Sequence, residues 1–302
     1  MLNSSSPRIR IVSALVLTLL LAAGCGGGGT STDVVGSGGT GSISGVVTKG
    51  PLSNATITGY GISGGQMGPQ IGMTTTDANG KFSILTGTYA GPVKLPASGG
   101  AYKDEATGSS MGMAAGDVMT AVMPSVVSGA NSNGIQVTPV TAMAQVRAQS
   151  MTGGMTDTNI AAANAAMGSY VIVNDILHVQ PMNPLTTGSG TGASQDARNY
   201  GMTLAAMSQY AKTLNMSISS AMVTAMMNDA SDGVMDGRKG VSQISMSMGG
   251  MMGTSMMSAT AGTNGLATAM TDFMGSAANA SGVTAADMTV LTQKLAKSNG
   301  HI

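Results

Sequence analysis

The stretch "TTTDANGKFSI", residues 74–84, decides how the first half of the chain folds. Threonine, phenylalanine and isoleucine on either side favour extended strands, whereas Asp-Ala-Asn-Gly in the centre favours a tight turn with Gly80 at positive φ. A calcium loop is the alternative, because Asp77 and Asn79 both offer oxygen ligands. No acidic residue follows nearby to complete such a loop. We therefore predict a β-hairpin.

Similar β-prone runs extend on both sides of this stretch. From Ile43 to Val127, short runs rich in Val, Ile and Thr are separated by Gly, Pro, Asn and Asp. Short strands separated by turns at intervals of about ten residues are typical of antiparallel sandwiches. The pattern thus predicts an antiparallel β-sandwich that is not interrupted by helices.

Three segments resemble the carboxypeptidase regulatory-like domains, which are transthyretin-like β-sandwiches of many bacterial surface proteins. They are residues 74–84, "SGVVTKGPLSNATIT" at 44–58 and "GPVKLPASGGAYKDEATG" at 91–108. The resemblance implies a transthyretin-like β-sandwich at residues 42–128. It also implies a module that braces, spaces or binds rather than one that catalyses.

The amino terminus has the composition of an export signal. Residues 7–25 read "PRIRIVSALVLTLLLAAGC", with two arginines before an apolar run from Ile11 to Ala23. This run is shorter than the about 20 residues that a spanning helix needs, and it suits the centre of a signal peptide. We predict a signal peptide at residues 1–24, with an uncleaved membrane anchor as the alternative.

The end of this segment, "LAAGC", resembles the lipobox of bacterial lipoproteins, although Ala22 stands where that family prefers leucine. The resemblance implies cleavage before Cys25 and lipid attachment to its sulfur. Cys25 is the only cysteine, so an internal disulfide is impossible. Residues 25–41 form a Gly/Ser-rich stretch that predicts a flexible tether. Gly26 replaces the aspartate that retains enterobacterial lipoproteins at the inner membrane, which favours the outer membrane.

The overall composition limits the classes of partner. Charged residues make up 9% of the chain and aromatic residues 3%, and the formal net charge is zero. A nucleic-acid partner is therefore not expected, because no basic patch is available to neutralise phosphates and few rings can stack on bases. The shortage of aromatic rings also argues against a carbohydrate platform.

The second half of the chain carries helical patterns. Thr138 is suited to cap a helix that begins with Pro139, and Tyr200, Leu204 and Met207 recur at helical spacing. Further helices are predicted at residues 157–167, 218–229 and 263–279, and in "VTAADMTVLTQKL", residues 283–295. The predicted fold is an α+β multidomain chain, with an antiparallel transthyretin-like β-sandwich followed by an irregular, methionine-rich helical domain at residues 135–300.

Candidate catalytic groups are few in this half. His178 is one of two histidines, and Asp175 is placed to orient it, so a Ser-His-Asp hydrolase is one interpretation. A packed structural histidine is the simpler one. Asp229, Asp232 and Asp236 match the spacing of a calcium loop poorly, and we expect an acidic turn there.

Six methionines are concentrated in "SMSMGGMMGTSMMS", residues 245–258, inside a predicted flexible loop at 240–262. Clustered thioethers bind Cu(I) or Ag(I), so this loop is a candidate metal site. The main alternative is that these methionines only pack, in a chain that generally uses methionine in place of leucine. Another alternative is an adaptable surface for contact with a protein. The candidate ligands are Met246, Met248, Met251, Met252, Met256 and Met257.

Together these features predict an exported lipoprotein of the cell envelope, attached to the outer membrane through Cys25. We expect a non-enzymatic binding or structural module, with another envelope or surface protein as a candidate partner. A Cu(I)-binding protein is the first alternative and a hydrolase the second. No cofactor is expected unless the methionine loop binds copper.

Overall fold

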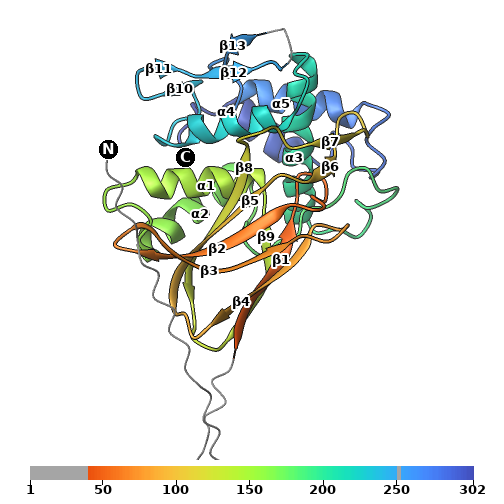
Figure 1. Cartoon of the computed structure of the whole chain (residues 1–302). Coiled ribbons are helices and arrows are strands. Elements are labelled where there is room, and N and C mark those ends of the chain that lie inside the picture. Colours follow the sequence, from red (N-terminus) through yellow and green to blue (C-terminus); the bar gives the residue numbers. More distant parts are fainter. Residues whose placement is uncertain (1–39, 250–252) are drawn as a thin grey trace, which may run out of the picture. The chain divides into compact units, whose positions relative to one another are not determined.

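The computed structural model describes residues 40–249 and 253–302. The predicted signal peptide, Cys25 and nearly all of the predicted tether lie outside the described residues. The described part contains several β-sheets and six helices, so an α+β fold is confirmed (Figure 1). These elements belong to a single compact unit.

The larger sheet has four strands in the order β3-β2-β5-β8, and all neighbours are antiparallel. Alternate residues of β5 point into the core: Val93, Leu95 and Ala97 are fully buried. The strands are β2 (Thr56–Ser63), β3 (Gln66–Thr75), β5 (Gly91–Ser98) and β8 (Val118–Val126).

The smaller sheet has three strands, β1 (Gly41–Val47), β4 (Lys81–Gly87) and β9 (Asn131–Val137), with β1 in the centre. Strand β1 pairs with β4 antiparallel but with β9 in parallel. The predicted antiparallel pairing therefore holds for the other strand pairs of the described residues but not for β1 and β9. Parallel neighbours need a long crossover, and here the whole chain between β1 and β9 provides it. Strand β9 also extends the β part beyond residue 128.

The two sheets share one hydrophobic core. In β4 the burial alternates, with Phe82 and Ile84 inside and Lys81 and Leu85 exposed. Phe82 and Ile84 pack in one cluster with residues of the larger sheet such as Leu95. Because the period of a strand is two residues, this alternation buries one face and exposes the other.

The turn at residues 77–80 forms as predicted, but it does not close a hairpin. Gly80 has φ of +75°, and its N–H donates to the Asp77 carbonyl at 3.0 Å. Asp77 Oδ1 accepts the N–H groups of Asn79 and Lys81, both at 2.8 Å, so it stabilises the turn. Strands β3 and β4 on either side of the turn belong to different sheets, so the β-hairpin prediction was wrong.

Three small two-stranded sheets complete the strands. Strands β6 and β7 lie between β5 and β8 in the sequence, and the other two pairs precede α5. They are β6 (Ala101–Lys103), β7 (Ser110–Gly112), β10 (Arg238–Lys239), β11 (Ser242–Gln243), β12 (Ser245–Ser247) and β13 (Thr254–Met256).

Three of the six described helices begin at a residue whose side chain caps them. Thr138 caps α1 and forms a reciprocal capping box with Thr141, with Pro139 at the first position. Thr284 bonds to Asp287 as expected, but the last helix begins only at Thr289. The helices are α1 (Pro139–Ser150), α2 (Asp157–Val171), α3 (Gln195–Thr213), α4 (Ser220–Ala230), α5 (Asn264–Met274) and α6 (Thr289–Ala296).

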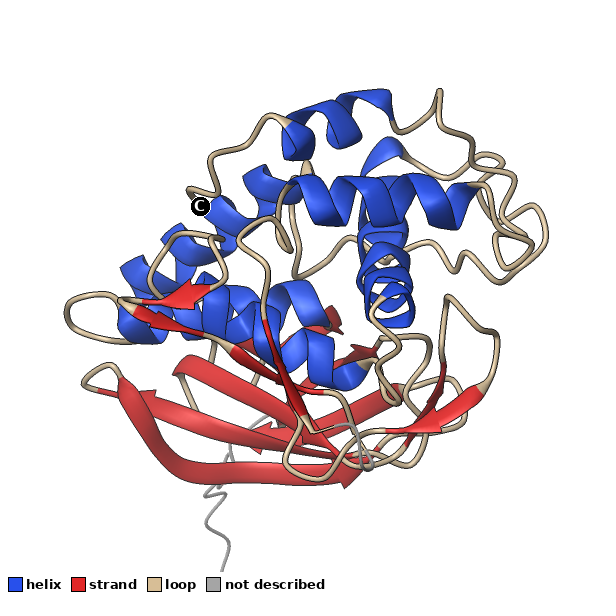
Figure 2. Ribbon diagram, turned by 90° about the horizontal axis from the view of Figure 1, so that it is seen from above, coloured by secondary structure: helices blue, strands red, loops and turns tan. Residues whose placement is uncertain are grey.

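The helices lie over the sheets, as the view from above shows (Figure 2). Helices α1 and α2 pack against β8, and α3 packs against α5. The predicted stripe of α3 is buried, because Tyr200, Leu204 and Met207 are at most 2% exposed. Many methionines share the helical core with them.

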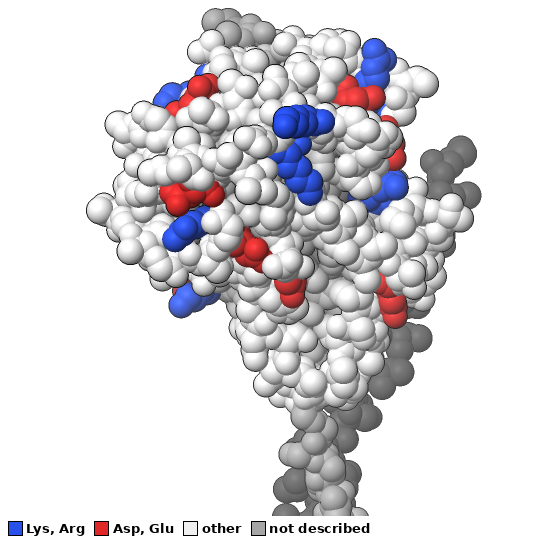
Figure 3. Space-filling model, turned by 180° about the vertical axis from the view of Figure 1, so that it is seen from behind, with Lys and Arg blue, Asp and Glu red and all other residues white. Residues whose placement is uncertain are grey.

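The surface carries few charges. One face shows isolated acidic and basic side chains among large uncharged areas (Figure 3), in line with the 9% of charged residues. Among residues 40–249 and 253–302, no helix has both the length and the apolar character needed to cross a membrane.

We predict that Gly80→Ala destabilises the protein more than Gly87→Ala. Both glycines have positive φ, at +75° and +59°. A Cβ at Gly80 would lie 2.5 Å from the Val47 carbonyl oxygen, whereas nothing lies within 4 Å of one at Gly87. We expect the free energy of unfolding, measured with urea, to fall by about 1 kcal/mol in Gly87→Ala and by about 3 kcal/mol in Gly80→Ala. Equal losses would contradict the close contact.

Candidate functional site

A buried ionic network joins the β part to the helices. Lys49 lies in the turn after β1, Asp104 and Glu105 follow β6, Ser208 is on α3, and Ser219 precedes α4. Lys49 Nζ donates to Ser208 Oγ at 2.5 Å and to Glu105 Oε2 at 3.2 Å. Ser208 Oγ donates to Glu105 Oε2 at 2.6 Å, and Ser219 Oγ donates to Asp104 Oδ2 at 2.5 Å. All five residues are buried.

The contacts within the network stabilise the charged forms of Lys49 and Asp104 although both side chains are buried. Burial alone lowers the pKa of Lys49, but Glu105, Tyr102 and Asp104 outweigh it and raise the pKa above its usual value. Burial alone raises the pKa of Asp104, but the Lys49 charge and hydroxyl donors such as Ser219 lower it. Lys49 therefore keeps its proton at neutral pH.

An aromatic ring completes the surroundings of the Lys49 ammonium. Lys49 Nζ lies 5.0 Å from the centroid of the Tyr102 ring, a distance suited to a cation–π interaction. The Tyr102 hydroxyl is hydrogen-bonded to Ser219 Oγ at 2.9 Å. Each polar group of the cluster thus has a partner, which a buried charge requires.

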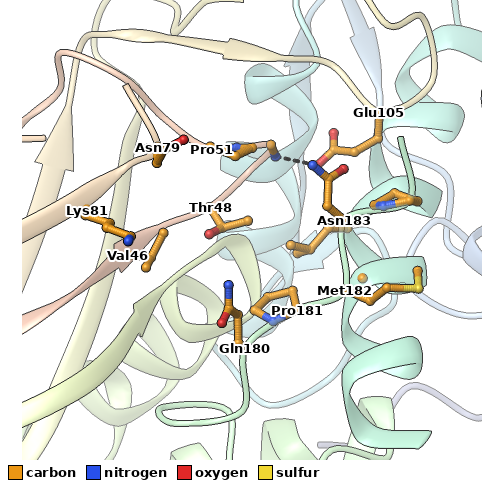
Figure 4. A pocket seen from close by; sticks show the side chains of 14 residues that line it. Val46, Thr48, Pro51, Asn79, Lys81, Glu105, Gln180, Pro181, Met182 and Asn183 are labelled. Atoms are coloured by element: carbon orange, nitrogen blue, oxygen red, sulfur yellow. Dashed lines mark hydrogen bonds between the residues drawn. The ribbon is translucent and has the colours of Figure 1, made fainter. Parts of the chain in front are cut away.

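A cleft of about 420 Å³ lies beside this network. Val46 of β1, Thr48 just after β1 and Lys81 of β4 line it on one side, and the segment 180–184 lines it from the helical part (Figure 4). The Glu105 side chain reaches the cleft from the network. The cleft is therefore built by segments that are distant in the sequence.

A glycine of α3 brings the segment 180–184 close to the helix. A Cβ at Gly201 would lie 2.0 Å from the Met182 carbonyl oxygen, so only glycine fits there. The Met182 N–H donates to the Ala197 carbonyl at 3.0 Å, which fixes the segment to α3. Met182 and Leu204 then supply apolar surface to the cleft.

The predicted His178–Asp175 pair forms in a second hollow, of about 600 Å³. His178 Nδ1 lies 2.8 Å from Asp175 Oδ2, and both side chains are half-exposed, so His178 is not the packed residue that the simpler interpretation expected. Ser125 and Ser132 line the same hollow. In the described part of the chain, neither serine hydroxyl hydrogen-bonds to the histidine ring.

The methionine-rich stretch forms a hairpin, β12–β13, rather than an irregular loop in its described part. Met246, Met248 and Met257 are at most 8% exposed and pack in the helical core. Met256 is 58% exposed and pairs with Ser245, so it points to the face opposite Met246. Met251 and Met252 lie outside the described residues.

The acidic turn after α4 is held by a buried carboxylate. Asp229 Oδ1 accepts the N–H groups of Asp236 at 3.0 Å and Gly237 at 2.7 Å. Asp229 Oδ2 has no hydrogen-bond partner in the described structure. Within residues 40–249 and 253–302, no three His, Cys, Asp or Glu side chains are grouped to hold a metal ion.

The network and the cleft were missed by the sequence analysis. Lys49 lies in "VTKGP" and the two carboxylates in "KDEATG", segments whose residues predict only turns and closing strands. A lysine beside an apolar strand and two adjacent acidic residues are the only signals. Neither signal identifies the partner, because the contacts span up to 159 residues of sequence.

Comparisons with known proteins carry little information about this chain. No family model matches it, and none of the curated proteins matches it. Among solved structures, a 9R-lipoxygenase from Cyanothece PCC8801 is 16% identical, with a TM-score of 0.21. The alignment covers 33% of this chain and 16% of the lipoxygenase chain.

We predict that Lys49→Met strongly destabilises the protein. The change leaves Glu105 and Asp104 buried without their counter-charge, which costs about 3–5 kcal/mol. Lys103→Met is the control, because Lys103 is exposed and makes no ion pair within the described residues. Urea unfolding of both variants measures the effect, and equal small losses would show that the network is not needed for stability.

We predict that Asp229→Asn removes one pH dependence of stability. Burial raises the pKa of Asp229 to about 7. The native protein therefore holds this proton above pH 4 while the unfolded chain releases it, so the free energy of unfolding falls as pH rises from about 4 to about 7. The asparagine variant retains the Oδ1 acceptor and should lose this contribution. The free energy of unfolding is measured at several pH values between about 4 and about 7. The same pH dependence in both proteins would refute the prediction.

Proposed function

We propose that this protein is a lipid-anchored protein of the cell envelope that acts as a non-enzymatic binding module. In this proposal Cys25 carries the lipid, residues 25–41 act as the tether, and the outer membrane is the site of attachment. The observation that carries the binding role is the cleft of about 420 Å³ between β1, β4 and the segment 180–184. Concave sites with an apolar floor and a few polar groups are typical of ligand binding.

The buried network supports a rigid binding site. Glu105 lines the cleft, and it is held by Lys49, by Ser208 and by the Gly50 N–H at 2.7 Å. A site whose polar groups are fixed before binding loses less entropy on association.

We further propose that the β part is a transthyretin-like sandwich. Two sheets of four and three strands with a common core support this proposal. The parallel pair of β1 and β9 is a departure from a purely antiparallel arrangement. A second envelope or surface protein remains the candidate partner of such a module.

The alternative functions remain predictions. Met246, Met248 and Met257 are packed in the core, which favours the packing interpretation over a Cu(I) site. The hydrolase interpretation has the His178–Asp175 contact in its favour but no hydrogen bond from a described serine to the ring. Neither geometry supports its function as directly as the cleft supports binding.

We predict that Cys25→Ser abolishes lipid attachment. Bacteria that express the full chain are grown with an alkyne-labelled fatty acid, and both the label and the membrane fraction are examined. The unchanged chain should carry the label and sediment with membranes, whereas the variant should do neither. A control variant, Lys81→Met, alters the cleft and should still be labelled. Labelling of the Cys25→Ser chain would refute the proposed anchor.

A further inference from the structure

We propose that the cleft binds the carboxyl end of a short, extended peptide. This inference rests on the proposed binding function and names its ligand class. Three features carry it: one basic side chain on the rim, uncommitted amide side chains along the walls, and an apolar floor that ends at a buried carboxylate. Each feature matches a different part of a peptide terminus.

The basic group is Lys81, the only lysine or arginine among the residues that line the cleft. It is the first residue of β4, and its N–H is fixed by Asp77 Oδ1 at 2.8 Å. Its side chain is exposed, and its ammonium has no hydrogen bond or ion pair with another described residue. A carboxylate is the complementary ligand group, since an ammonium–carboxylate hydrogen bond is among the stronger ones in proteins.

The amide groups belong to Asn79, Gln180 and Asn183. The side chains of Asn79 and Gln180 make no hydrogen bond within the described structure, and Asn183 uses only its Oδ1, which accepts the Leu185 N–H at 3.0 Å. An amide side chain offers both a donor and an acceptor, the same pair that a peptide group presents. A fatty acid or a simple anion would use the lysine but not these amides.

The floor and the inner end set the direction of the ligand. Met182 and Leu204 are nearly fully buried and offer apolar surface to a side chain. In the close view, Lys81 and Glu105 lie at opposite ends of the labelled group (Figure 4). Glu105 repels a second carboxylate and accepts N–H groups, so the terminal carboxylate lies at Lys81 and the upstream amides lie toward Glu105.

The size of the cleft agrees with a ligand of this class. Its volume of about 420 Å³ falls at the lower end of the usual range for small-molecule sites, about 300–1,000 Å³. A few residues of a peptide fit there, and a folded protein does not. Capture of a terminal carboxylate is a recurrent mode of peptide recognition.

The test is a calorimetric titration of the purified full chain with acetyl-Ala-Val-Ala as the free acid and as its carboxyl-terminal amide. We expect the acid to bind about tenfold more tightly than the amide, because only the acid pairs with Lys81. In Lys81→Met the two peptides should bind equally. The matched control, Lys103→Met, removes an exposed lysine of β6 that does not line the cleft, and it should retain the preference.

Two outcomes would overturn the inference. Equal binding of acid and amide to the unchanged chain, or a preference that survives in Lys81→Met, would remove the role of the carboxylate. Saturation-transfer NMR with a set of neutral fragments then shows whether the cleft binds other ligands, as the proposed function requires, or binds nothing. If fragments bind the unchanged chain but not the cleft-filling variant Thr48→Trp, the binding module is kept and the peptide is rejected. If no probe binds at all, both are rejected.

Discussion

The ion pair between Lys49 and Glu105 is the interaction on which the rest of the structure depends. It connects the turn after β1 to the segment after β6, and Ser208 brings α3 to the same point. Buried charges are unfavourable unless each is paired and hydrogen-bonded. The β part and the helices must therefore meet in one arrangement, because any other arrangement leaves a charge in the interior without a partner.

This constraint also explains why the cleft has a defined shape. The carboxylate of Glu105 is fixed by three donors on one side and lines the cleft on the other. The contact of Gly201 with Met182 holds the opposite wall against α3. The site is thus formed at a junction of layers whose positions are set by buried polar contacts, and its rim carries the uncommitted groups that a ligand would use.

Local sequence patterns were reliable where structure depends on neighbouring residues. The turn at Gly80, the cap at Thr138 and the buried stripe of α3 all formed as expected. Pairing between distant segments was predicted less well. Strands β3 and β4 enter different sheets, and β1 has a parallel neighbour, because strand period specifies which face is buried but not which strand lies alongside.

The sequence by itself determined the turns, the helix caps and the faces to be buried, since these follow from backbone preferences and residue spacing within a few positions. Only the tertiary structure decided the role of Lys49, which meets partners 55 to 159 residues away in sequence, and the packing of Met246 in the core rather than in a loop. It also decided the cleft, whose walls come from β1, β4 and residues 180–184. Burial and long-range pairing depend on how all the elements pack together, and that information is not contained in any single stretch of the chain.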